Sequence, residues 1–229
     1  GHQPTIESLE RIAHGETEPM LAAQVLAPLY EQLAEWERLV DLQEVMIKHT
    51  EDPVARIERL HTVAGIHERQ SAEYDKAFDA YARALALDPQ GEHTIVQLER
   101  LSEVTTEWER YAALLAEQAA IVADPIVKVQ LLVRLARTLE GRLANPEGAV
   151  ERYLEVLQLD PEHAESIGAL DRIFGTTQRY PELVDNLQRQ IAITGDEQEV
   201  IELYLRMGQI YQYSLAAPAK AIAAYREIC

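Results

Sequence analysis

The chain has 229 residues, of which 47% are hydrophobic, so it has the length and apolar content of a folded protein rather than a disordered one. Its formal charge of −18 argues against binding to nucleic-acid phosphates or to an anionic membrane surface, because like charges repel. The single cysteine, Cys229, excludes an internal disulfide and a thiolate metal site, and no apolar run approaches the roughly 18 residues of a membrane span.

Neither end of the chain looks like a natural terminus. Gly1 and His2 resemble the remnant of a purification tag, and residues 225–229 stop where earlier segments continue into Leu-Asp-Pro. We therefore expect a fragment of a longer protein. The sequence shows no signal-peptide pattern, and a lone cysteine suits a reducing compartment, so we expect a cytoplasmic location.

The first part of the chain, residues 1–35, predicts two helices of divergent sequence. Apolar residues recur at helical spacing within 4–14, and a second helix is expected over 18–34. Pro28 lies inside the second helix, and we expect it to kink or split that helix because proline removes a backbone donor.

From residue 36 onward the sequence repeats with a period of 72 residues. Trp36 recurs as Trp108 and then as Tyr180, which favours a structural role for both tryptophans. An ungapped alignment of 36–107 with 108–179 has 20 identical positions out of 72. We therefore treat the whole chain, 1–229, as one solenoid fragment with double-hairpin repeats, the last of them incomplete. These repeats are 36–107, 108–179 and 180–229.

Each repeat predicts four helices. Asp52 is placed to cap the second helix, with Pro53 at its first position, and such a cap contributes about 1 kcal/mol. Pro89 predicts the end of the third helix, because the residue before a proline disfavours the helical region. In the first repeat the helices are expected near 36–50, 53–70, 74–87 and 91–105.

Small residues and tyrosines recur at fixed spacing inside the repeats. The two best patterns are Ala77-x3-Tyr81-x2-Ala84 followed by Pro89, and Tyr204-x2-Met207-Gly208-x2-Tyr211. These patterns resemble the tetratricopeptide repeat (TPR) family, in the divergent tandem form found in bacteria. The alternate hairpins, such as 91–122, keep fewer of the small residues and are divergent members.

The resemblance implies an all-α fold, a right-handed α-solenoid of stacked antiparallel helical hairpins. The physical pattern agrees, because small residues let paired helices approach closely and a single hairpin cannot bury its apolar face alone. The small positions are 64, 77, 136, 149, 208 and 221. We expect Tyr81, Tyr153 and Tyr225 to fill the grooves between neighbouring hairpins.

No sequence motif indicates a catalytic, cofactor-binding or metal-binding site. The chain has no Gly-x-Gly pair, P-loop, Gly-x-Ser-x-Gly or His-Glu-x-x-His motif. His61 and His67 lie on different sides of one helix and cannot share a metal. His14, Glu16 and Glu18 lie near a turn where they could touch a cation, although a solvated loop is the simpler interpretation. We therefore predict no enzyme activity, no cofactor and no metal site.

The function expected from the resemblance is that of a protein-interaction scaffold, which binds a partner protein or peptide in a concave groove. The acidic surface leaves open a basic partner segment, although acidity also serves solubility. Two alternatives remain open: a structural or self-assembling spacer, and a regulatory arm of a larger protein whose enzymatic part lies outside this fragment. The sequence does not identify the oligomeric state.

The predicted binding surface follows from the family, in which the first helix of each hairpin lines the concave face. Positions between its packing residues Ala64, Ala136 and Gly208 should point into the groove. Tyr213 and Arg137 are the expected hot spots by residue type. The predicted set is Glu58, His61, Glu68, Arg69, Gln130, Arg137, Glu140, Glu202, Gln209, Gln212 and Tyr213, with Arg100 and Arg172 from the divergent hairpins.

Overall fold

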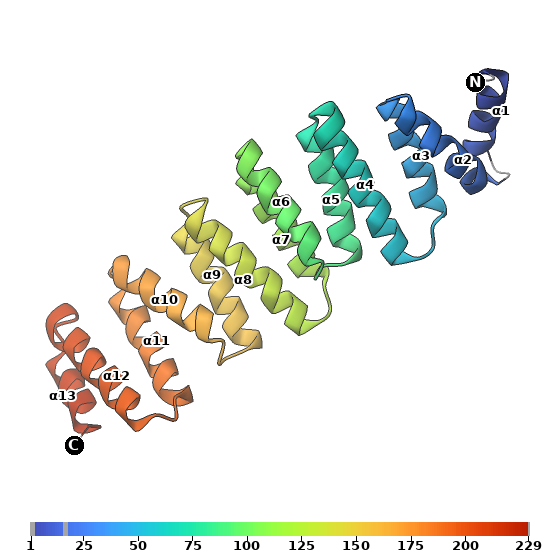
Figure 1. Cartoon of the computed structure of the whole chain (residues 1–229). Coiled ribbons are helices and arrows are strands. Elements are labelled where there is room, and N and C mark those ends of the chain that lie inside the picture. Colours follow the sequence, from blue (N-terminus) through green and yellow to red (C-terminus); the bar gives the residue numbers. More distant parts are fainter. Residues whose placement is uncertain (1–2, 16–17, 229) are drawn as a thin grey trace. The chain divides into compact units, whose positions relative to one another are not determined.

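The computed structural model describes residues 3–15 and 18–228 of the chain. Within these residues there are thirteen α-helices and one short π-helix, and no strand (Figure 1). In chain order the helices are α1 (Gln3–Ala13), α2 (Pro19–Gln32), α3 (Trp36–His49), α4 (Pro53–Ser71), α5 (Tyr74–Leu87), α6 (Glu92–Thr105), α7 (Trp108–Ile121), α8 (Pro125–Gly141), α9 (Pro146–Leu159), α10 (Ala164–Thr176), α11 (Tyr180–Ile193), α12 (Glu197–Gln209), the π-helix η1 (Ile210–Ser214) and α13 (Pro218–Arg226).

The helices form two compact units, unit 1 over residues 1–114 and unit 2 over 115–229, and the division falls inside α7. In unit 1, each helix from α1 to α5 packs against the next helix in the chain, and in unit 2 the same holds from α8 to α12. Figure 1 shows the antiparallel hairpins that this order produces. The predicted fold class, an all-α solenoid of stacked antiparallel hairpins, is confirmed.

Helix starts recur with the same 72-residue period as the sequence. Asp52 accepts hydrogen bonds from two backbone N–H groups of the first turn of α4, as predicted for its N-cap. Asp124 caps α8 in the same way, and Asp196 caps α12 although no proline follows it. The cap therefore depends on the aspartate, because its side chain satisfies backbone donors that a helix leaves unpaired.

The second helix, α2, differs from the sequence prediction in one respect. α2 runs without a break through Pro28, so the predicted split does not occur. Proline removes only one hydrogen bond from the helix interior. Ala23, Leu26 and Tyr30 on the buried side of α2 pack into a core with α1 and α3, and this packing holds the helix together across the missing bond.

The loops carry a second periodic feature, a left-handed backbone conformation at residues that are not glycine. Ala72, Ala144 and Ala216 have φ angles of 52°, 47° and 47°, and they lie 72 residues apart. Another series at the same spacing consists of Ala34, Thr106 and Gln178. Each conformation turns the chain sharply from one helix into the next, so the backbone repeats even where the residue type does not.

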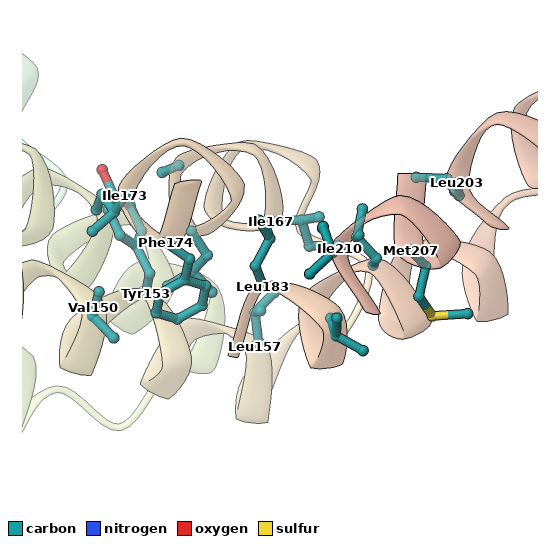
Figure 2. Close-up of a cluster of buried hydrophobic side chains, with 14 of the residues drawn as sticks. Val150, Tyr153, Leu157, Ile167, Ile173, Phe174, Leu183, Leu203, Met207 and Ile210 are labelled. Carbon is teal, nitrogen blue, oxygen red and sulfur yellow. The ribbon is translucent and has the colours of Figure 1, made fainter. Parts of the chain in front are cut away.

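The packing between hairpins confirms the role of the small residues. Ala136 and Ala149 are fully buried, and Tyr153 is 1% exposed within a cluster whose residues come from α8 to α13 (Figure 2). At Gly208, a Cβ would lie 2.4 Å from the Tyr225 ring, so the close approach requires glycine. Tyr225 itself is only half-buried, which corrects its predicted burial, because no described helix covers α13.

Candidate functional site

The candidate site lies on the first helix of each hairpin, here called the A helices: α2, α4 and α6 in unit 1, and α8, α10 and α12 in unit 2. Each unit contains a hollow along these helices. In unit 1 the hollow, here called groove 1, has a volume of about 860 Å³ and receives residues from α2, α4 and α6. In unit 2 the hollow, groove 2, has a volume of about 470 Å³ and receives residues from α8 and α10.

The two grooves bring together seven of the predicted residues. His61, Glu68, Arg69 and Arg100 line groove 1. Arg137, Glu140 and Arg172 line groove 2. The side chains come from residues about 30 positions apart in the sequence, because one further helix, α5 or α9, lies between successive A helices.

The other six predicted residues lie outside these grooves and are exposed to solvent. Tyr213 is 77% exposed within η1. The amide oxygen of Gln212 accepts a hydrogen bond from the Tyr225 hydroxyl at 3.2 Å, so it packs against its own hairpin. The remaining four are Glu58, Gln130, Glu202 and Gln209.

Both grooves contain the same ion pair between successive A helices. In groove 1, Arg100 on α6 pairs with Glu68 on α4 at 2.6 Å. In groove 2, Arg172 on α10 pairs with Glu140 on α8 at 2.8 Å. The arginines are substantially exposed, so each pair contributes at most about 1 kcal/mol to stability. Their main effect is to orient the side chains that line the grooves.

A buried tyrosine lies beneath each ion pair. The Tyr153 hydroxyl is 3.5 Å from a carboxylate oxygen of Glu140, and burial, with a smaller contribution from the charge on Glu140, raises the pKa of Tyr153 to about 12. Burial raises the pKa of Tyr81 in groove 1 as well. Both hydroxyls therefore remain neutral at physiological pH and form an amphipathic floor to the grooves.

Groove 1 also contains a cluster of rings. His61 Nε2 lies 2.8 Å from the Thr94 hydroxyl oxygen, and the His61 ring centroid is 5.0 Å from that of His93 and 5.4 Å from that of Tyr81. Burial lowers the pKa of His61, and proximity to His93 adds to this effect. His61 is therefore neutral near pH 7 and acts as a packed ring rather than as a cation.

Several groove residues escaped the sequence prediction. His93 and Glu165 occupy equivalent positions in the two grooves, and each lies seven residues before a predicted arginine, Arg100 or Arg172. A separation of seven residues places side chains on one face of a helix, so this spacing could have identified them. Trp36 also lines groove 1, although the sequence suggested only a structural role for it.

The described residues contain no group of three or more His, Cys, Asp or Glu side chains that could hold a metal ion. Glu16, one of the three residues considered for a cation near the first turn, lies outside the described residues. Cys229 also lies outside them. Within the part of the chain that the structure covers, no helix combines the length and the apolar character needed to cross a bilayer.

Comparisons with known proteins give a likeness of fold. No family model matches the sequence, and no curated protein matches it. The C-terminal part of a TPR repeat-containing protein from Cytophaga hutchinsonii aligns over 97% of this chain and 88% of its own, with 13% identity and a TM-score of 0.43. PilF of Pseudomonas aeruginosa aligns over 90% and 94%, with 15% identity and a TM-score of 0.43.

A third neighbour, YrrB, is described as a TPR protein with an unusual peptide-binding site. It aligns over 86% of this chain and 97% of its own, with 16% identity and a TM-score of 0.38. The structural neighbours are thus TPR-repeat proteins over most of the chain. At these identities the likeness concerns the fold alone.

Proposed function

We propose that this chain is a non-catalytic scaffold that binds a partner protein or peptide along its A helices. The observation that carries the proposal is the convergence of polar side chains from successive A helices on a hollow in each unit. TPR folds typically serve as protein-binding scaffolds. Hollows of this kind are open along the helices and suit an extended segment rather than an enclosed small molecule.

The pattern of variation between repeats supports the same function. The packing positions Ala64, Ala136 and Gly208 stay small in all three repeats. The position that follows each of them is Gly65 in the first repeat but Arg137 in the second. A scaffold needs a constant core, whereas the groove is free to differ and thereby to select a partner.

Two exposed residues are the expected hot spots. Tyr213 offers a large aromatic surface, and Arg137 offers a planar guanidinium with several donors. Aromatic and arginine side chains dominate binding energy in many interfaces, because they combine contact area with directional hydrogen bonds. We propose that these two side chains contact the partner, together with the other predicted residues of the A helices.

The experiment begins with a pull-down of partners on the immobilised chain, followed by mass spectrometry and affinity measurements on the recovered partner. Tyr213→Ala and Arg137→Ala should each weaken binding by on the order of tenfold. Asp79→Ala and Arg152→Ala serve as matched controls on the second helices of hairpins, α5 and α9. Weaker binding of both control variants, with no change for Tyr213→Ala and Arg137→Ala, would refute the proposed surface.

A further inference from the structure

Groove 2 neutralises its own arginines. The Nε and Nη2 atoms of Arg137 each lie 2.5 Å from a carboxylate oxygen of Glu165, in the bidentate geometry that suits a guanidinium and a carboxylate. Arg172 is paired with Glu140 in the same groove. Each of the two cations that line groove 2 is therefore paired with a carboxylate from the neighbouring A helix.

Groove 1 carries a different set of residues at the equivalent positions. Gly65 stands where groove 2 has Arg137, and His93 stands where groove 2 has Glu165. Groove 1 also has an arginine on α4, Arg69, but it lies one helical turn after the position of Gly65. On α6, neither His93, at the position of Glu165, nor Gln97, one helical turn further along, is acidic.

The geometry of Arg69 leaves its guanidinium in the groove. An Nη2 atom of Arg69 lies 2.5 Å from the point that a Cβ on Gly65 would occupy, so the guanidinium lies over the glycine. Its Nε donates to the Gly65 carbonyl oxygen at 3.4 Å, a long hydrogen bond. Among the described residues, no carboxylate lies within 4.0 Å of this guanidinium, although the carboxylate of Glu68 is engaged nearby with Arg100.

The other charges that line groove 1 limit what can bind there. With Arg100 and Glu68 paired, the remaining charged side chains of the lining are Arg69 on α4 and Glu31 on α2. Between these helices the wall includes apolar groups from Pro28 and Ile66. The lining of groove 1 thus includes one cation on α4, one anion on α2 and apolar groups from both helices.

We propose that groove 1 takes one Asp or Glu side chain of an extended partner segment at Arg69. The partner's carboxylate fills the role that Glu165 fills internally in groove 2. The net charge of −18 disfavours a run of acidic residues, so the acidic side chain is flanked by neutral or basic ones, with any basic residue toward Glu31. This inference rests on the proposed scaffold function and specifies its partner.

The probe is a random dodecapeptide display library selected on the whole chain. A selected peptide is then synthesised with its acidic residue and with the matched amide, Glu to Gln or Asp to Asn. The chain should bind the acidic peptide about tenfold more tightly than the amide. Arg69→Gln and His93→Glu should each abolish this preference, the first by removing the cation and the second by supplying an internal carboxylate. The control Arg152→Gln, on α9 and outside both grooves, should retain it.

The outcomes separate the two proposals. Selected peptides that show no preference for the acid, or a preference that survives both Arg69→Gln and His93→Glu, would overturn the assignment of Arg69 and leave the scaffold function standing. Failure of the library to yield any binding peptide would instead count against the scaffold function, and the assignment would fall with it. Melting curves of each variant establish that it is folded, as expected for substitutions of exposed side chains.

Discussion

The left-handed residues in the loops within hairpins lead to a prediction in which one substitution has opposite signs at two sites. Ala144 joins α8 to α9 with a φ angle of 47°. The left-handed region costs a residue with a Cβ about 1–2 kcal/mol, and glycine avoids this cost. Glycine loses about 0.5–1 kcal/mol more than alanine through conformational entropy. Ala144→Gly should therefore stabilise the chain by about 0.5–1 kcal/mol.

The periodicity of the backbone allows the effect to be multiplied. Ala72 and Ala216 have the same conformation as Ala144, and the three residues lie in separate loops. Substitutions at distant sites are close to additive, so the triple glycine variant should gain about 1.5–3 kcal/mol. For a chain of this length, each kcal/mol raises the melting temperature by roughly 2–4 °C.

The matched control is Ala113→Gly, which removes the same methyl group from an exposed position inside α7. A glycine in a helix interior costs about 0.5–1 kcal/mol, so this variant should melt at a lower temperature. Circular dichroism at helical wavelengths during thermal and urea unfolding measures both shifts. If Ala144→Gly and Ala113→Gly lowered the melting temperature equally, the left-handed conformation at residue 144 would be refuted.

Two further predictions concern the core of unit 2. Ala149→Leu should destabilise the chain by about 1–3 kcal/mol, because Ala149 is fully buried. The control Gln158→Leu, on the exposed side of α9, should change the stability by less than about 0.5 kcal/mol. Equal unfolding midpoints of the two variants would contradict the packing. Because the folded pKa of Tyr153, about 12, lies above the unfolded value near 10, its contribution to the free energy of unfolding is present below about pH 10 and is lost toward pH 12. Tyr153→Phe should make that alkaline loss smaller in urea titrations, and an unchanged loss would argue against a buried hydroxyl.

Much of the fold could be predicted from sequence because the signals are local and repeated. An aspartate before a helix, a proline after one, and a small residue every 72 positions each act on neighbouring backbone or on the next helix. The limits of local reasoning appear at Pro28, where packing against α1 and α3 keeps α2 continuous. They also appear at Tyr225, whose burial depends on a covering helix rather than on its own repeat position.

For the candidate site as well, part could be predicted from the sequence and part depended on the tertiary structure. The sequence by itself determined which faces of the A helices carry variable polar residues, because the 72-residue period separates them from the constant packing positions. Only the tertiary structure decided that Arg137 is neutralised by Glu165 and that Arg69 is not neutralised. An ion pair depends on side chains that approach within a few ångströms from helices a whole hairpin apart, and that distance is set by how the hairpins stack.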